Sequence, residues 1–220
     1  MRLPEPPLLL VTDRRQARIP LSELIEVAFA AGCRWASLRE KDLPKAEQLA
    51  LTRRLLPLAR RFDAKLTLHG DPALAQAAGF DGVHLPAGGD AKTARALLGP
   101  AALVGASIHD LAEAAALDPA LDYAIAGPVR ETASKPGYGP ALGFAGLAAI
   151  AATTRVPIIA IGGIDAAIVP EILASGAVGV AVMGGIMRAA NPAVEVKGLI
   201  AALCGCYQPH SALARKRSPR

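Results

Sequence analysis

The chain has 220 residues, of which 52% are hydrophobic and 4% aromatic, and its formal net charge is +5. This length and apolar content suit one large domain, and no apolar run reaches the roughly 18 residues that a membrane-spanning helix needs. The excess positive charge follows Cys204, where no acidic residue occurs and the basic residues are Arg215, Lys216, Arg217 and Arg220. Because the rest of the chain is close to neutral, we expect neither a nucleic-acid interface nor a membrane contact.

Residues 204–220 are therefore predicted to be a basic, disordered tail, and residues 1–203 to form the domain. The cysteines Cys33, Cys204 and Cys206 match neither a disulfide framework nor a metal site, so we expect reduced thiols. Residues 1–15 are interrupted by prolines and lack the long apolar region of a signal peptide. We expect a cytoplasmic protein.

Short apolar segments alternate with segments of helical character along the whole domain. The predicted strands span residues 8–12, 35–39, 65–69, 82–85, 103–107, 123–127, 157–161 and 178–183. The predicted helices span residues 21–31, 44–61, 72–78, 91–98, 111–117, 144–153, 165–174 and 192–203. This alternation requires a parallel sheet, and eight such units predict a closed (β/α)8 barrel, the TIM barrel, in a single domain. An open doubly wound sheet is the alternative.

Charged and hydroxyl side chains follow two of the predicted strands. Arg39 and Lys41 have the same parity, so both should point into the mouth of the barrel. Two cations aimed at one cleft need an anionic partner, which favours a phosphate, pyrophosphate or carboxylate ligand. Thr132, Ser134 and Lys135, in the loop 128–142, form a second candidate anion site. Solvated loop residues are the alternative for this second group.

Glycine pairs follow the last two predicted strands, at Gly162-Gly163 and at Gly184-Gly185. Glycine lets backbone N–H groups approach an anion without a Cβ atom in the way, and (β/α)8 barrels build phosphate sites after these two strands. The pairs therefore predict a phosphate site at one rim of the barrel.

Two histidines and a serine, His69, His84 and Ser107, also lie at predicted strand ends. Imidazole titrates near neutral pH, which makes the histidines candidates for proton transfer. For His84, which stands between Val83 and Leu85, a buried core histidine is the alternative.

An ordered set of motifs resembles the superfamily of thiamin phosphate synthases and thiazole tautomerases. The motifs are LVTDR at 10–14, SLREKD at 37–42, DGVHLP at 81–86, GASIH at 105–109, DYAIAGPVRETASK at 122–135 and PIIAIGGI at 157–164. The resemblance covers about residues 8–203 and implies a (β/α)8 barrel. Synthases join hydroxymethylpyrimidine pyrophosphate to thiazole phosphate with magnesium, whereas the tautomerases isomerise a thiazole phosphate carboxylate.

The resemblance implies a role for several residues of this chain. Arg39 and Lys41 match the synthase residues that contact pyrophosphate, and Ser107 matches the serine after strand five. The remaining matches are the anion-binding loop and the thiazole phosphate site: Thr132, Ser134, Lys135, Gly162, Gly163 and Gly184.

Four positions depart from the synthase pattern. Ser37 replaces a Gln, His69-Gly70 replaces Asn-Asp, and residues 86–89 replace a motif that ends in Asp. The last two changes remove both magnesium ligands, and Asp71 and Asp90 each lie one place away. These changes favour the tautomerase-like branch, although Pro128 stands where that branch has its catalytic His.

We therefore expect a tautomerase-like protein that binds a phosphorylated thiazole or thiamin phosphate and needs no cofactor, with His69 preferred over His84 for proton transfer. The first alternative is a synthase that uses Mg²⁺ held by Asp71 or Asp90. The second is a barrel that binds thiamin phosphate without turnover. Assembly into a homo-oligomer is left open by the sequence.

Overall fold

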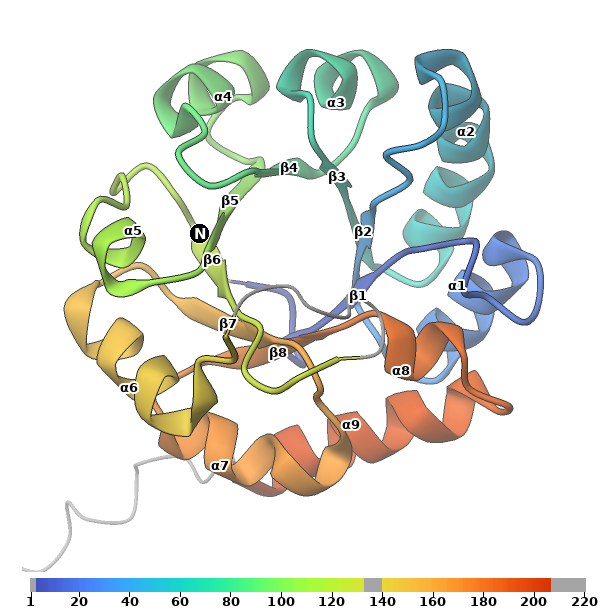
Figure 1. Cartoon of the computed structure of the whole chain (residues 1–220). Coiled ribbons are helices and arrows are strands. Elements are labelled where there is room, and N and C mark those ends of the chain that lie inside the picture. The colour runs from blue at the N-terminus through green and yellow to red at the C-terminus, as the bar shows by residue number, and fades with distance from the viewer. Residues whose placement is uncertain (1–2, 133–139, 207–220) are drawn as a thin grey trace, which may run out of the picture.

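The computed structural model of the chain describes residues 3–132 and 140–206. In this part of the chain, eight parallel strands form one closed barrel in sequence order, and helices surround it (Figure 1). The prediction of a single-domain (β/α)8 barrel is confirmed. Ser134, Lys135 and residues 207–220 of the predicted tail lie outside the described residues.

The strands are buried almost throughout, because helices cover the outside of the sheet and side chains fill the inside. They are β1 (Leu8–Val11), β2 (Trp35–Leu38), β3 (Lys65–His69), β4 (Gly82–Leu85), β5 (Leu103–Ile108), β6 (Tyr123–Ala126), β7 (Ile158–Ile161) and β8 (Gly179–Val182). The predicted strand 35–39 ends one residue early. The amide of Arg39 donates to the Thr12 side-chain oxygen, at 2.9 Å, instead of continuing the backbone ladder.

The helices that form the outer ring match the predicted ones to within a few residues. They are α1 (Leu21–Ala30), α2 (Lys45–Arg61), α3 (Pro72–Ala78), α4 (Ala91–Leu98), α5 (Leu111–Ala115), α6 (Gly143–Thr153), α7 (Val169–Ala174), α8 (Gly184–Met187) and α9 (Pro192–Cys206). A 3-10 turn at Ala166–Ile168 precedes α7, so Asp165 caps this turn and not the α-helix itself. The short α8 was not predicted, and α9 continues past residue 203 to Cys206.

Alternate residues of each strand face the barrel axis, where an inner core excludes water. The rings of Trp35 and Tyr123 meet edge to face there, with their centroids 4.7 Å apart. Gly105 makes room for this packing, because a Cβ atom at that position would lie 2.1 Å from the Tyr123 ring. The inner core closes the barrel below its carboxyl end, so a ligand can enter only from the rim above it.

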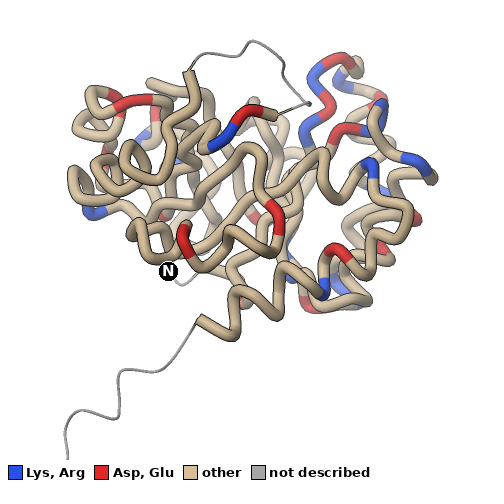
Figure 2. The backbone as a smooth tube through the Cα atoms, turned by 60° about the horizontal axis from the view of Figure 1, so that its bottom comes forward, with Lys and Arg blue, Asp and Glu red and all other residues tan. Residues whose placement is uncertain are grey.

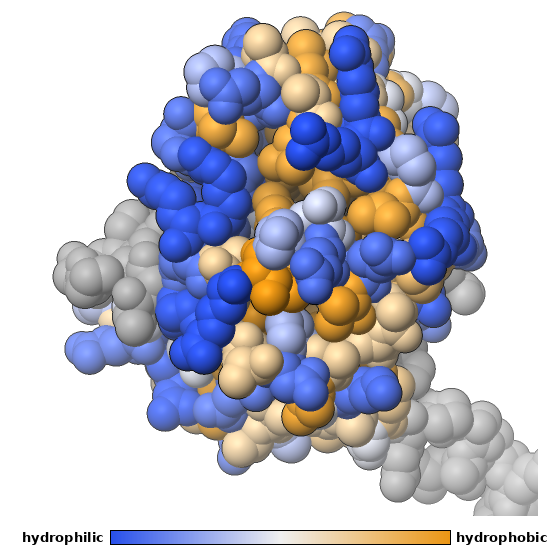
Figure 3. All heavy atoms as spheres, turned by 90° about the vertical axis from the view of Figure 1, so that its right-hand side faces the viewer, coloured by the Kyte–Doolittle hydropathy of each residue, from blue (hydrophilic) through white to orange (hydrophobic). Residues whose placement is uncertain are grey.

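Charges of both signs are distributed over the outside of the barrel. Figure 2 shows Lys and Arg positions interspersed with Asp and Glu along the described part of the chain. Figure 3 shows the side of the molecule that carries α2, where polar side chains surround smaller apolar areas. Within residues 3–132 and 140–206, no helix combines the length and the apolar character needed to cross a membrane.

Candidate functional site

A cavity of about 410 Å³ opens at the carboxyl ends of the strands. Its volume suits a small molecule. Every predicted binding or proton-transfer residue in the described part of the chain contributes to its lining: Arg39, Lys41, His69, His84, Ser107, Thr132, Gly162, Gly163, Gly184 and Gly185. The tertiary structure thus brings residues from seven segments of the chain to one rim, as expected for this fold.

Arg39 and Lys41 form the cationic side of the cavity, after β2. They continue the parity of Trp35, which faces the barrel axis, and both line the cavity as the alternation predicts. Partial burial of the Lys41 ammonium group lowers its pKa, and the positive charge of Arg39 lowers it further. The two positive charges repel each other. An anion with more than one negative charge would relieve this repulsion by binding between them.

The floor of the cavity carries the two histidines. His69 on β3 and His84 on β4 are register partners, and their ring centroids lie 4.6 Å apart. A hydrogen bond of 2.9 Å joins His84 Nε2 to Ser107 Oγ. Burial lowers the pKa of His84 to about 3, with a further contribution from Lys41. His84 is therefore a neutral imidazole at physiological pH, and it orients the Ser107 hydroxyl.

The two glycine pairs form the opposite side of the cavity. Gly162 and Gly163 have φ angles of +104° and +64°, a conformation that side chains other than glycine rarely adopt. A Cβ atom on Gly162 would lie 2.6 Å from Pro128 Cβ. The loop after β6 packs this closely because the Arg130 amide donates to the Gly162 carbonyl at 3.1 Å. Gly184 and Gly185 form the first turn of α8, where backbone N–H groups are available to an anion.

Four further charged or titratable residues line the cavity and were not predicted as site residues: His109, Glu131, Asp165 and Arg188. Arg188 lies one helical turn after Gly184, so its place beside the glycine pair follows from helical periodicity, which could have identified it. Its guanidinium group donates to the Gln16 side chain, which in turn donates to Asp13 at 2.7 Å. This chain of contacts connects α8 to the loop after β1.

The carboxylates that the resemblance offers for magnesium are engaged elsewhere. Asp71 caps α3 by accepting from the Ala73 amide at 2.9 Å, and it pairs with Lys45 Nζ at 2.9 Å. Asp90 caps α4 by accepting from the Thr93 amide at 2.9 Å and from the Thr93 hydroxyl. Neither carboxylate lines the cavity.

Hydrogen bonds explain the acidity of these two carboxylates. The bond from Lys45 lowers the pKa of Asp71, and the bonds from Thr93 lower that of Asp90. Within the described residues, no group of three or more His, Cys, Asp or Glu side chains is arranged to hold a metal ion. Magnesium prefers octahedral oxygen ligation with carboxylates among the ligands. Asp71 and Asp90, which cap helices outside the cavity, are therefore not placed to hold a magnesium ion in it.

The comparisons with known proteins agree with one another. The family model described as thiamine monophosphate synthase matches residues 8–186. A Geobacter sulfurreducens protein, provisionally named a thiamine-phosphate synthase, is 42% identical over 199 residues, which are 89% of this chain and 93% of that protein. The thiamine-phosphate synthase of Salinispora tropica is 37% identical over 88% of this chain and 95% of its own. The solved structure of a thiamine phosphate pyrophosphorylase from Pyrococcus furiosus superposes with a TM-score of 0.80 at 28% identity, and covers 91% of this chain and 96% of that one.

Proposed function

Because this chain belongs to the thiamine monophosphate synthase family, we propose that it is a thiamin phosphate synthase. It would join a hydroxymethylpyrimidine pyrophosphate to a thiazole phosphate and release thiamin phosphate and pyrophosphate. The names of the relatives favour this reaction over the isomerisation that the departures from the synthase motifs suggest. These relatives are named as enzymes, which agrees with the prediction from the sequence that this protein is an enzyme of the family.

One observation carries the proposal: the cavity has two different sets of groups for anions. Arg39 and Lys41 supply two positive charges on the side of β2, and the glycine pairs supply backbone donors after β7 and β8. A charged pair suits a pyrophosphate, whose charge grows as it departs, whereas backbone donors suit a monophosphate that only anchors its substrate. A reaction with one pyrophosphorylated and one monophosphorylated substrate uses both.

The proposed reaction needs no proton transfer at the reacting atoms. The bond between the methylene carbon of the pyrimidine and the pyrophosphate oxygen breaks, and its electron pair leaves with the oxygen. The lone pair of the thiazole nitrogen forms the new carbon–nitrogen bond, which makes the ring a cation. Arg39 and Lys41 stabilise the departing charge electrostatically. In the His84 tautomer that carries its proton on Nε2, Ser107 accepts from His84, and its hydroxyl hydrogen can then be donated to that group.

A second candidate, a thiazole tautomerase, is favoured by the histidine pair on the floor. Moving a proton within a bound ring needs a neutral base and a held phosphate. His69 lies in the cavity lining beside neutral His84, with 4.6 Å between the ring centroids. In this reaction His69 is the preferred proton-transfer group, and the cationic pair would have no leaving group to stabilise.

The purified protein should be assayed with both synthase substrates, with and without EDTA, and with a thiazole phosphate carboxylate alone. The synthase proposal expects thiamin phosphate and an equal amount of pyrophosphate. Since Asp71 and Asp90 lie outside the cavity lining, we expect product to form in EDTA as well. Isomerisation without condensation, lost in His69→Ala, would replace the synthase by the tautomerase. If the protein binds thiamin phosphate tightly but shows neither activity, it is a binding protein without turnover.

A further inference from the structure

Between the two cations of the cavity stands a carboxylate that points the other way. Glu40 has the parity of Leu38, which packs outside the barrel, whereas Arg39 and Lys41 have the parity of Trp35 in the inner core. Its side chain is only 1% exposed. A buried carboxylate is costly unless charges and hydrogen bonds compensate it, so its partners should reveal what it does.

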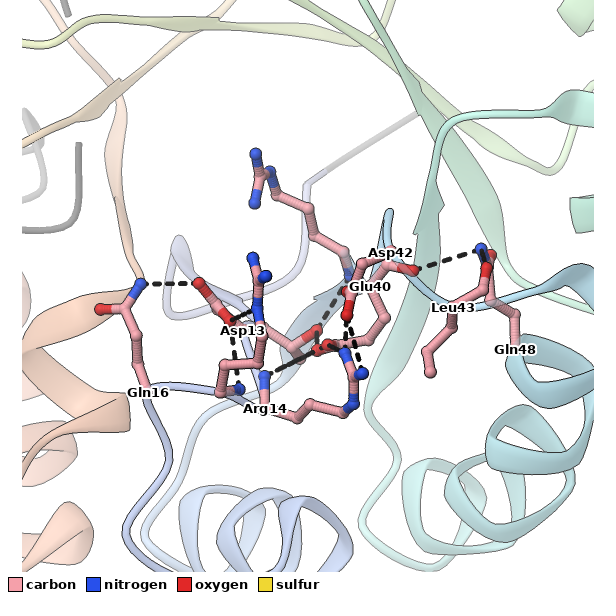
Figure 4. Close-up of polar contacts among 10 residues, drawn as sticks. Asp13, Arg14, Gln16, Glu40, Asp42, Leu43 and Gln48 are labelled. Carbon is pink, nitrogen blue, oxygen red and sulfur yellow. Dashed lines mark hydrogen bonds and ion pairs between the residues drawn. The ribbon is translucent and has the colours of Figure 1, made fainter.

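Four contacts from the end of β1 compensate Glu40 (Figure 4). The Thr12 hydroxyl donates to Oε1 at 2.7 Å. The Arg14 amide donates to both carboxylate oxygens, at 3.1 and 3.2 Å, and the Arg14 guanidinium group donates to Oε2 at 3.1 Å. The guanidinium group also forms a bidentate pair with Asp42, at 2.8 and 2.7 Å, and the hydrogen bonds to Asp42 and Glu40 raise the pKa of Arg14.

Thr12 connects this cluster directly to the cationic segment. Its oxygen accepts from the Arg39 amide at 2.9 Å while its hydroxyl hydrogen goes to Glu40. Glu40 thereby fixes the direction of the Thr12 hydroxyl, and Thr12 fixes the backbone of Arg39 where the strand ladder has already ended. On the far side, the Glu40 carbonyl accepts from the Leu43 amide at 3.1 Å and from the Gln48 side chain at 3.2 Å.

The cluster has a specific task, because it is energetically unfavourable for both cations to face the cavity side by side. Arg39 and Lys41 repel each other, and Lys41 is partly desolvated. A segment free to rotate would turn one of them toward solvent. Anchoring the residue between them, on the opposite side of the backbone, prevents that rotation before any ligand binds. Such preorganisation improves the stabilisation of charge by a fixed pair.

We propose that Thr12 and Glu40 are positioning residues that hold Arg39 and Lys41 toward the cavity for a pyrophosphate group. This inference rests on the proposed function, because it assigns the cationic pair to the pyrophosphate side. A structural ion pair without this role would stabilise the fold but leave anion binding unchanged once the protein is folded.

Thr12→Val tests the proposal, since valine has the shape of threonine and lacks the hydroxyl. Thr12→Ser keeps the hydroxyl and serves as the matched control. Titration calorimetry with inorganic pyrophosphate and with inorganic phosphate gives the readout, in the full-length protein. We expect Thr12→Val to weaken pyrophosphate binding roughly threefold to tenfold, the effect of one lost hydrogen bond. Thr12→Ser should change it less than about twofold, and phosphate binding should be unaffected in both.

Two further variants separate this inference from the proposed function. If Arg39→Ala also leaves pyrophosphate binding unchanged, the cationic pair does not bind pyrophosphate and the proposed function loses its support. If Arg39→Ala weakens binding and folded Thr12→Val does not, the positioning role is overturned. Should Thr12→Val unfold, Glu40→Gln replaces it with the same expectation. Asp42→Asn breaks only the exposed pair with Arg14 and should leave pyrophosphate affinity unchanged.

Discussion

The imidazole of His84 lies between two different neighbours on the barrel floor: the ring of His69, with 4.6 Å between the centroids, and the hydroxyl of Ser107, at 2.9 Å from Nε2. The ring also stacks on Tyr123, with 5.6 Å between the centroids. Packing among these neighbours buries the ring completely, and this burial, together with the positive charge of Lys41, lowers the pKa of His84 and keeps the imidazole neutral. Both interpretations of His84, as a core residue and as part of the site, describe one side chain.

The first prediction concerns the pH dependence of stability at His84. Its pKa falls from the ordinary value of 6.5 to about 3 on folding, so the unfolded chain binds the proton more readily. The resulting contribution is fully favourable to the folded state above pH 6.5 and decreases as the pH falls from 6.5 toward 3. Between pH 7.5 and pH 5, the wild type should lose about 2 kcal/mol of unfolding free energy through this group.

Chemical denaturation of wild type and His84→Gln at both pH values measures this contribution. Glutamine does not titrate, so the variant should lose about 2 kcal/mol less than the wild type over the same interval. Carboxylates elsewhere titrate in both proteins and cancel in the difference. Equal losses would show that His84 is protonated in the folded protein, contrary to the depressed pKa.

The second prediction concerns the division of the cavity into two anion sites. Arg39→Ala should weaken the binding of a ligand that carries both a pyrophosphate and a monophosphate. The expected loss of binding free energy is about 1.5–3 kcal/mol, the usual range for a charged hydrogen bond. Inorganic phosphate, held at the glycine pairs, should bind almost as before. Calorimetry with both ligands decides, and Arg54→Ala on the exposed side of α2 is a control for net charge. Equal weakening of both ligands would contradict two separate sites.

The third prediction separates backbone strain from steric conflict by comparing two glycines of the barrel loops. Gly162 and Gly88 both have positive φ angles, of +104° and +70°, but only Gly162 has a neighbour that a Cβ atom would strike. Gly88→Ala should cost about 1 kcal/mol of stability through strain alone. Gly162→Ala should cost about 1–3 kcal/mol more and weaken phosphate binding, because Pro128 must move. Similar costs for the two variants would show that the loop after β6 yields easily.

The fourth prediction concerns Asp71 and Asp90, the alternative metal ligands. As helix caps both carboxylates stabilise the folded state, so Asp71→Ala should lower the unfolding free energy by about 1 kcal/mol, and Asp90→Ala should lower it as well. Turnover and its response to EDTA should stay as in the wild type. Loss of EDTA-sensitive synthesis in either variant would restore a carboxylate-held magnesium ion and refute the assignment of both residues as structural caps.

Local patterns in the sequence were sufficient for the strands, for the helices other than α8, and for part of the rim of the site. The strands 65–69 and 82–85 and the helices 72–78 and 91–98 have the predicted bounds, because a glycine or a proline directly follows each of them: Gly70, Pro86, Gly79 and Gly99. The parity of Arg39 and Lys41 and the glycine pairs after the last strands were likewise readable, since side-chain alternation is a property of every strand. The motifs were sufficient to identify the family, and the comparisons agree with that family.

Other features depend on distances between segments that are remote in the sequence. No pattern around Glu40 shows that Thr12 and Arg14 would surround it, and nothing around His84 shows that it would form a hydrogen bond with Ser107. Asp71 and Asp90 look like displaced metal ligands in the sequence, and only the backbone amides of α3 and α4 show that they are caps. The sequence determined the barrel and placed Arg39, Lys41 and the glycine pairs at its rim, because both follow from local periodicity. The tertiary structure alone decided which of those residues face one another, because closure of the barrel sets those distances.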